Sequence, residues 1–538
     1  MQEMQKEFKP NSIQSKAVLI AVILFITASL FGVLEIYQIY RLNQLVSGEI
    51  TQFNKLVESD KYEEARELFI NVSRQTSGNK REQAIEQMKE ELASKVKNLS
   101  NQILSEKLAL TTQQIKGLQL FKTEISSKLD SELEKVTLQY MDGKIDYKTF
   151  AHYIEEIAPL DLPDIGKYQA LARAEELKRK LNFKEAAVIL EAIGNDYPDD
   201  LLLTQKISEY EKEAAKLVVY KGPVQHIFFH PMIAYPELAF DGDSLSKGYN
   251  DYFITVKEFK KILESLYGKN YVLINLNSLY EEKAVDGSKK LVKKELLLPQ
   301  GKKPLIISID DLNYYDYMQK NGNVSKLILD NEGNIATLSV SQQGETVISR
   351  DNEIVPILDR FIERHPDFSF QGAKGIINLT GYQGILGYRT NLSSPIHESE
   401  REKVLPIIKR LKETGWLFAS HGWGHLDAQK ISYSILVRDT ERWKREVETL
   451  VGPVSVYVYP YGSSVLPGDA KYRYLVEAGF KVLAGIGPKE YLKFRPDSIM
   501  MDRRHIDGIA ILTQSSTLQD LFDSSKVIDS ARPRKQNP

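Results

Sequence analysis

The chain has 538 residues, more than one hydrophobic core can serve, which predicts about two to four domains. With 42% hydrophobic and 27% charged residues it has the composition of a globular protein, and its net charge of -2 gives no reason to expect nucleic acid as a partner. The sequence contains no cysteine, which excludes disulfides and thiolate metal sites but indicates no compartment.

The first predicted element is an apolar segment near the N-terminus. Residues 17–34 are all apolar or small, and isoleucines and tyrosines extend the segment to residue 40. A membrane-spanning helix needs roughly 20 apolar residues, whereas a signal peptide has a shorter apolar core that ends at a small-residue cleavage site. We therefore expect an uncleaved transmembrane anchor over 17–40, in preference to a signal peptide. The lysines of residues 1–16 predict a cytoplasmic tail, and hence a single-pass protein of the cell membrane whose remaining chain is extracellular.

Residues 42–219 follow a helical pattern. The segments 62–69 and 183–190 share an aromatic residue, then charges, then an alanine-containing apolar stripe at helical spacing. This form resembles the paired helices of tetratricopeptide solenoids, although no fixed period is visible. We expect a stalk of packed helices; a docking surface for a protein partner is the alternative.

Strand-like and helical runs alternate from residue 222 to about 525, which is typical of parallel strands wrapped by helices, in a barrel or a doubly wound sheet. A hairpin insertion turning at Gly333 is expected near 325–349, and a flexible tail over 529–538. The predicted strands cover 224–229, 271–274, 304–309, 375–379, 416–419, 454–459 and 480–484, and the predicted helices 256–266, 354–364, 399–413, 437–450 and 471–478.

Two polar motifs follow predicted strands of this region. Asp310 and Asp311 come directly after 304–309, and His421 and His425 follow 416–419. In a barrel, the chemistry lies at the C-terminal ends of the strands. One aspartate and two histidines can supply the three protein ligands of a catalytic divalent metal, with a position left for water, and the second aspartate is then free to act as a base. The pattern predicts a metal-dependent hydrolase.

These motifs resemble those of the polysaccharide deacetylase (NodB-homology) family. The segment 308–312 is similar to the Thr-Phe-Asp-Asp-Gly motif, 421–425 to His-Ser/Thr-x-x-His, and 459–462 to Arg-x-Pro-Tyr, in the family's order. The resemblance covers about 224–515 and implies an α/β fold, a distorted (β/α) barrel deacetylase domain over 222–525. Three positions depart from the motifs: Leu312 replaces glycine, Gly422 replaces serine or threonine, and Val458 stands where the family has an arginine that braces the base.

The resemblance also implies the role of each motif residue. Asp310 would be the general base, and Asp311, His421 and His425 would bind a divalent metal ion, zinc, with cobalt or nickel as alternatives. The backbone N–H of Tyr461 would help to hold the oxyanion. No other cofactor is expected.

Two histidines are candidates for the acid that protonates the leaving amine, a role that suits the imidazole pKa. His505 lies late in the chain, where many family members carry this acid. His230 ends the first predicted strand of the domain, a placement similar to that in poly-N-acetylglucosamine deacetylases, which also lack the arginine of the third motif; it is the favoured candidate. The family's fourth motif, an aspartate with a tryptophan, has no clear match. The remaining histidines show no partner pattern and are expected to be structural or solvated: His152, His226, His365 and His397.

A glycine-rich aromatic loop, 380–389, follows the predicted strand 375–379. Its residues Tyr382, Tyr388 and Arg389 would line a sugar-binding groove, or the loop is an ordinary turn; both interpretations stay open.

The expected function is that of a membrane-anchored, extracellular, metal-dependent hydrolase of carbon–nitrogen bonds other than peptide bonds. It would remove N-acetyl groups from a cell-surface polysaccharide, poly-N-acetylglucosamine or the peptidoglycan of the cell wall. Two alternatives follow from the departures and from the chemistry: a glycan-binding scaffold of the same fold that has lost activity, and an esterase acting on O-acetyl groups.

Overall fold

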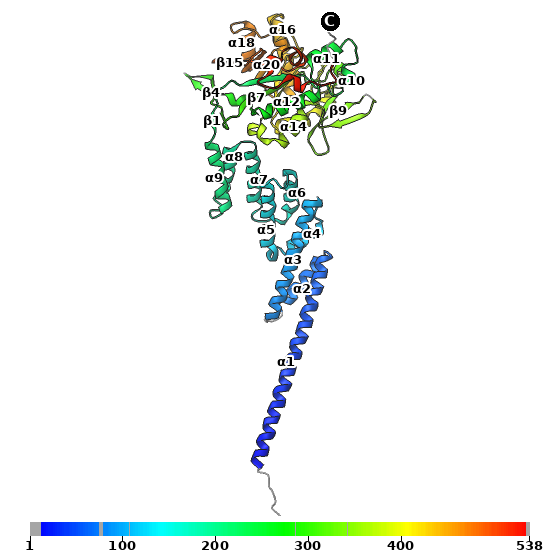
Figure 1. The fold of residues 1–538 in the computed structure, drawn as a ribbon, viewed down its shortest axis with the longest axis vertical. Helices are drawn as coiled ribbons and strands as arrows, with labels where there is room; N and C mark the ends of the chain where they lie inside the picture. Colours follow the sequence, from blue (N-terminus) through cyan, green and yellow to red (C-terminus); the bar gives the residue numbers. More distant parts are fainter. Residues whose placement is uncertain (1–11, 75–78, 107, 286, 342, 534–538) are drawn as a thin grey trace, which may run out of the picture. The chain divides into compact units, whose positions relative to one another are not determined.

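The computed structural model describes residues 12–74, 79–106, 108–285, 287–341 and 343–533 (Figure 1). The chain divides into two compact units, Met1–Arg173 and Ala174–Pro538. The helical region expected over 42–219 ends at Ala215 and contributes to both units.

The elements that the structure describes in the first unit are all helices, joined by short loops. Its helices bury stripes of apolar side chains spaced three or four residues apart, as Tyr62, Ala65, Phe69 and Val72 do on α2. The helices are α1 (Ser12–Glu58), α2 (Tyr62–Arg74), α3 (Asn79–Glu106), α4 (Thr112–Leu120), α5 (Lys122–Met141), α6 (Tyr147–Ile157) and most of α7 (Ile165–Arg179).

Helix α1 differs from the others because its first half is apolar on all sides. Within the described residues, Ala17–Glu58 is the one helix long and apolar enough to cross a membrane. Its large apolar side chains between Val18 and Tyr40 are exposed, whereas Phe53 and Val57 near its end are buried. The helix is therefore a candidate membrane anchor or signal sequence. Of the expected cytoplasmic tail, residues 1–11 lie outside the described residues.

The second unit begins with the helix pair α8 (Phe183–Gly194) and α9 (Leu201–Ala215) and then forms a closed barrel of parallel strands. Seven strands of the described chain pair in a ring, because β16 pairs with β2 at one end of the order and β11 pairs with β7 at the other. This closure excludes the doubly wound sheet and confirms the (β/α) barrel. In ring order the strands are β2 (Gln225–Phe229), β7 (Lys303–Asp310), β11 (Gly375–Leu379), β12 (Leu417–Ser420), β13 (Val456–Val458), β14 (Val482–Ile486) and β16 (Ile499–His505).

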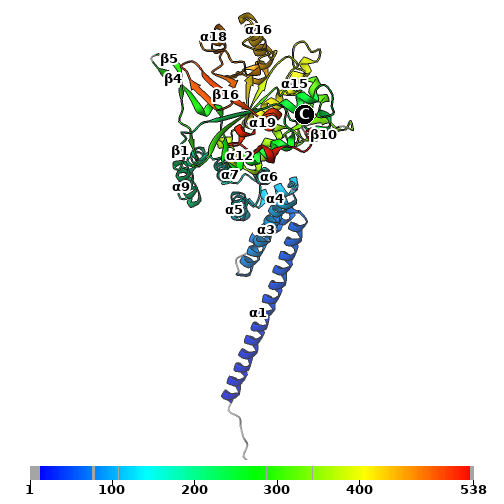
Figure 2. The same ribbon diagram turned by 45° about the horizontal axis from the view of Figure 1, so that its top comes forward.

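Largely apolar runs form most of these strands, since helices cover their outer face. In β7 every residue from Pro304 to Asp310 is buried, which is typical of a parallel strand covered on both sides. One edge of β7 carries two partners: β3 (Tyr271–Leu273) pairs with residues 303–305 and β11 with residues 307–310. Helices lie around the ring in Figures 1 and 2, among them α12 (Val256–Gly268), α14 (Ile354–Arg364), α15 (His397–Glu413), α16 (Tyr433–Trp443) and α18 (Ala470–Glu477).

The remaining elements are short. The helices are α10 (Pro236–Ala239), α11 (Ser246–Tyr252), α13 (Asp316–Lys320), α17 (Thr449–Val451), α19 (Gly508–Thr513), α20 (Ser515–Leu518) and α21 (Ser524–Val527); the strands outside the ring are β1 (Val218–Val219), β4 (Tyr280–Val285), β5 (Ser288–Lys293), β6 (Leu297–Leu298), β8 (Lys326–Leu329), β9 (Ile335–Val340), β10 (Thr346–Ser349) and β15 (Tyr491–Phe494).

Each predicted strand is present with its ends within two residues, and the structure corrects the sequence prediction at three other places. Strand β16 was not predicted, and it closes the barrel. The insertion turns at Gly333 as expected, but β10 adds a third antiparallel strand to the hairpin β8–β9. The tail expected to be flexible from residue 529 is packed against the barrel at least to Arg532, which is buried and pairs with Glu258 at 2.6 Å. Residues 534–538 lie outside the described residues.

Candidate active site

The two aspartates at the end of β7 reach the same pair of histidines. Asp310 Oδ2 lies 3.8 Å from His421 Nε2, and Asp311 Oδ2 lies 3.7 Å from His425 Nε2. Consecutive side chains of a strand point to opposite faces, so a regular strand would not allow this. Asp311 adopts the left-handed conformation, with φ 57°, which breaks the alternation and brings both carboxylates to one side.

Asp311, His421 and His425 form a group that can hold a metal ion. One ligand atom from each lies within 4.8 Å of the others. His421 Nδ1 lies 2.9 Å from the carbonyl oxygen of Val458, which fixes the proton on Nδ1 and leaves the Nε2 lone pair for a metal. Burial lowers the pKa of His421 to about 4, against the attraction of Asp310, so this imidazole is neutral near pH 7. The donor set therefore fits a divalent ion of the zinc class.

A tyrosine orients the carboxylate of this group. The hydroxyl of Tyr315 donates to Asp311 Oδ1 at 2.7 Å and lies 2.5 Å from Thr380 Oγ1. Such partners hold a ligand's orientation and tune its affinity for the metal.

Asp310 is braced from two other strands. Arg503 of β16 donates from Nη1 to Oδ1 at 2.6 Å and from Nη2 to Oδ2 at 3.0 Å, and Asn378 of β11 donates to Oδ1 at 2.6 Å. Burial alone would raise the pKa of the Asp310 carboxyl, but the Arg503 guanidinium and the nearby imidazoles hold it well below its usual range. Asp310 is thus kept ionised, as a base requires.

Arg503 takes the place of the arginine that is missing at Val458. The Val458 side chain is buried in the barrel core, and the guanidinium comes instead from β16, two strands further along the ring. Sequence reasoning missed this residue. The signal was present as an arginine pair, Arg503 and Arg504, next to His505, but no strand was predicted there to place it.

The other two departures also have structural reasons. Gly422 has φ 68°, and a Cβ added there would lie 2.9 Å from Asp439 Oδ2. That carboxylate accepts the backbone N–H groups of Trp423 and Gly424, each at 2.8 Å, and so shapes the loop between the two histidines. Leu312 is fully buried in the main core.

The two candidate acids both lie beside the Phe228 ring. The His230 ring is 5.9 Å from that of Phe228, and the His505 ring is 6.5 Å from it. His230 follows β2, which pairs with β7 in parallel with Phe229 opposite Ile309, so His230 and Asp310 lie at the same end of neighbouring strands. The Nε2 atom of His505 lies 3.1 Å from Gln514 Oε1 and is already engaged.

Three of the other histidines contact protein groups outside this centre. His226 is buried between Met501 Sδ and Ser308 Oγ, His365 packs on Tyr267, and His397 Nδ1 lies 2.8 Å from the carbonyl oxygen of Ser394. His152, in the first unit, lies 4.0 Å from Glu156. These contacts agree with structural roles.

Aromatic side chains from four neighbouring strand ends lie beside the metal-binding group. Tyr315 stacks on Tyr317 and on Tyr382, and Tyr382 meets Trp423 edge to face. The Tyr461 ring lies 4.6 Å from that of His425. Of Tyr382, Tyr388 and Arg389 in the loop 380–389, Tyr382 lies in this group: Tyr388 donates to the carbonyl oxygen of Leu327, and Arg389 pairs with Asp316.

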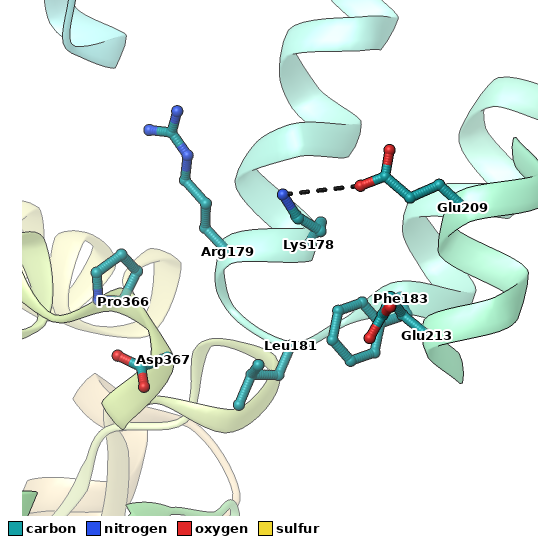
Figure 3. A pocket seen from close by; sticks show the side chains of 8 residues that line it. All are labelled: Lys178, Arg179, Leu181, Phe183, Glu209, Glu213, Pro366 and Asp367. Carbon is teal, nitrogen blue, oxygen red and sulfur yellow. Dashed lines mark ion pairs between the residues drawn. The ribbon is translucent and has the colours of Figure 1, made fainter. Parts of the chain in front are cut away.

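A cavity of about 440 Å³ shares no residue with the metal-binding group (Figure 3). It is lined by Lys178, Phe183, Glu209 and Asp367 among others, and Lys178 pairs with Glu209 across it at 3.9 Å.

The comparison with protein-family models agrees with the motifs. Residues 396–483 match the family model described as polysaccharide deacetylase. Among solved structures, the chain is similar to the Streptococcus pyogenes deacetylase PplD in complex with acetate, at 12% identity over 55% of this chain and 98% of that chain, with a TM-score of 0.27. No curated protein matches the chain. The family match supports deacetylation of an acetylated glycan as the chemistry of the barrel.

Proposed function

We propose that the barrel is a metal-dependent deacetylase that hydrolyses N-acetyl groups of a cell-surface polysaccharide. The observation that carries the proposal is the side-by-side placement of a three-ligand group, Asp311, His421 and His425, and a braced, ionised carboxylate, Asp310. Neither half alone specifies hydrolysis. Together they offer a place for a metal and a base next to it, within a domain that matches the polysaccharide deacetylase model in part of its length.

A divalent ion held by these ligands would polarise the acetamide carbonyl and lower the pKa of water from about 15.7 towards about 7. Asp310 accepts the proton of the attacking water through Oδ2, which has one donor, Arg503 Nη2, and lies 3.8 Å from His421 Nε2, whereas Oδ1 has two donors, Asn378 and Arg503. The backbone N–H of Tyr461 helps to hold the charge that develops on the carbonyl oxygen. The water oxygen adds to the carbonyl carbon, the C–N bond breaks, and acetate and a free amine leave.

His230 is the proposed acid that protonates the leaving nitrogen. It follows β2, the neighbour of β7 in the ring, and the register of these two strands supports its placement beside Asp310. His505 is the second candidate, with one ring nitrogen held by Gln514.

The proposed location is the outer face of the cell membrane, with α1 as the anchor over 17–40. Its exposed apolar side chains support this part of the proposal. The helices between the anchor and the barrel would serve as a spacer or as a docking surface for a protein partner.

The structure favours the enzyme over a scaffold of the same fold. Of the departures that motivated the scaffold interpretation, the missing arginine at Val458 is compensated by Arg503, and Gly422 and Leu312 fit their surroundings in the barrel. Zinc, with cobalt or nickel as alternatives, suits the ligand set.

Acetate release from N-acetylglucosamine oligomers and from peptidoglycan tests the function, with metal content measured on the same protein. We expect release that is abolished by a chelator, restored by zinc, and reduced at least a hundredfold in Asp310→Asn and His421→Ala. Metal-loaded wild type that binds oligomers without releasing acetate would support the scaffold, and release from O-acetyl substrates alone would support the esterase.

A further inference from the structure

The last described residues of the chain, 529–533, return to the segment 250–253 at the end of α11. Arg532 is buried and uses all five N–H groups of its guanidinium there. Nε and Nη2 donate to the Glu258 carboxylate at 2.6 and 2.8 Å, and Nη2 also donates to the carbonyl oxygen of Phe253 at 2.7 Å. Nη1 donates to the carbonyl and side-chain oxygens of Asn250 at 2.9 and 3.0 Å. One side chain near the end of the chain therefore holds both ends of this segment.

Asp529 strengthens the same attachment. Its backbone N–H donates to Glu258 Oε1 at 3.0 Å, and its Oδ2 accepts from the Thr255 hydroxyl at 2.9 Å. Thr255 and Glu258 form the capping box of α12, so the C-terminal residues are bonded to the first turn of that helix. Because these buried polar groups satisfy one another, the residues 529–533 are held in one position.

The segment 250–253 carries a ring that contacts His230, the proposed acid. The Phe253 ring lies 5.7 Å from the His230 ring, at an interplanar angle of 51°, and it stacks on Tyr249 at 4.6 Å. Phe253 is buried, and its carbonyl oxygen is one of the acceptors of Arg532. A displacement of Arg532 therefore moves the ring on which the imidazole rests.

The backbone that follows His230 is bonded to the same part of the chain. The Ile233 N–H donates to the carbonyl oxygen of Ile254 at 3.0 Å, and the Val256 N–H donates to the carbonyl oxygen of Ile233 at 3.2 Å. The residues after Phe253 thus fix the backbone close to His230, while Phe253 itself contacts the imidazole.

Helix α19 leaves room for this arrangement at its first residue. A Cβ added to Gly508 would lie 1.7 Å from the carbonyl oxygen of Asn250 and 2.9 Å from Arg532 Nη1. A side chain at this position would push the segment 250–253 away from the arginine. The glycine is therefore required by the same contact.

We propose that Arg532 is a positioning residue for His230: it fixes the segment 250–253, and through Phe253 it sets the orientation of the imidazole that protonates the leaving nitrogen. A general acid must lie within hydrogen-bond reach of the atom that it protonates, so a small rotation of the ring lowers the rate without weakening substrate binding. This inference rests on the proposed function, since it concerns the acid of the same reaction.

The test compares wild type with Arg532→Lys, Phe253→Leu and a matched control, Arg504→Lys. Lysine keeps a positive charge beside Glu258 but lacks the planar fork that reaches all the acceptors. Arg504 is 5% exposed, as Arg532 is, and pairs with the Asp520 carboxylate on the outer face of the barrel. Acetate release from an N-acetylglucosamine oligomer gives kcat and KM. Hydrolysis of phenyl acetate, whose leaving group needs no proton, reports on the rest of the site, and thermal unfolding verifies that each variant is folded.

We expect Arg532→Lys and Phe253→Leu to lower kcat on the N-acetyl oligomer about tenfold, with KM and phenyl acetate hydrolysis unchanged. Arg504→Lys should behave as wild type per folded molecule. In a His230→Asn background, Arg532→Lys should have no further effect, because the group that it positions is absent. An unchanged kcat in Arg532→Lys, an equal loss on both substrates, or a loss that persists in the His230→Asn background overturns the inference.

NMR of the imidazoles separates this inference from the proposed function. The eight histidines of the full-length, histidine-labelled protein give eight imidazole signals, and His230→Asn identifies the signal of His230. Arg532→Lys should shift that signal, and Arg504→Lys should not. If wild type releases no acetate, the proposed function fails and this signal still decides the positioning role. An unmoved His230 signal in Arg532→Lys refutes the role, and a shifted one supports it.

Discussion

Replacement of Arg503 by methionine tests whether this arginine orients Asp310, the proposed base. Three donors reach the Asp310 carboxylate in the wild type, two from Arg503 and one from Asn378. Methionine fills similar volume but removes two of the three donors and the charge, and leaves a carboxylate only 3% exposed without its counter-ion. Breaking a buried pair in this way destabilises a fold by about 3–5 kcal/mol. A base that is no longer oriented loses about a hundredfold in rate.

We expect Arg503→Met to lower kcat/KM for acetate release about a hundredfold per folded molecule, and Arg503→Lys, which keeps the charge but not the two-pronged geometry, to lie between it and wild type. Added methylguanidinium should restore part of the activity of Arg503→Ala but none in wild type, an effect that a purely structural role would not produce. Urea unfolding monitors the stability of each variant.

Arg504 provides the matched control. It is the next residue of β16, is also buried, and pairs with Asp520 at 2.7 Å on the outer face of the barrel. Arg504→Met should lose stability without losing activity per folded molecule. Equal rate losses in the two methionine variants, or full activity in Arg503→Met, would refute the inference that Arg503 orients Asp310 for catalysis.

Three further predictions concern other groups of the barrel. Tyr315→Phe removes the hydrogen bond to Asp311 and should weaken zinc binding about 10- to 100-fold in competition with a chelator, whereas unchanged affinity would show that the hydroxyl does not support the ligand. His230→Asn should lower the rate on N-acetyl substrates about a hundredfold but spare a phenyl acetate ester, whose leaving group needs no proton, and His505→Asn should do neither; the reverse pattern would make His505 the acid. Burial raises the pKa of Glu353 to about 8, so the folded protein keeps this proton while the unfolded chain loses it above about pH 4.5, and stability falls as pH rises between these values. In the wild type, this group contributes a slope of up to about 1.4 kcal/mol per pH unit to the free energy of unfolding between pH 5 and 8. Glu353→Gln should remove this contribution, measured by urea unfolding at several pH values. An unchanged slope would contradict the assignment.

The sequence predicted the parts of the fold whose signal is local. Strand β7 was predictable because residues 304–309 are apolar except for Ser308, and α14 because its apolar side chains recur at helical spacing. The aspartate pair and the histidine pair of the metal-binding group each follow such a strand. In a barrel the C-terminal ends of the strands meet at one end, so the sequence could predict that these side chains lie close together.

Strand β16 was not predictable in the same way. Asp502, Arg503 and Arg504 interrupt its apolar residues and argue against a buried strand. These charges are tolerated because Arg503 meets Asp310 inside the barrel and Arg504 meets Asp520 outside it, partners that are 193 and 16 residues away in the chain. A pairing partner so distant in the chain cannot be detected from the local sequence pattern, which is why the role of Arg503 was not predicted.

The position of β16 has a consequence for biosynthesis. The strand that closes the ring is the last of the seven to be synthesised, and it pairs with β2, the first. A growing chain therefore exposes the open edges of β2 and β14 until residue 505 has emerged, and such unpaired edges invite aggregation. The same late event delivers Arg503 to Asp310. Nascent chains arrested before β16 would hold the proposed metal ligands but lack the arginine that orients the proposed base, so we expect activity and barrel closure to be acquired together, at the end of translation.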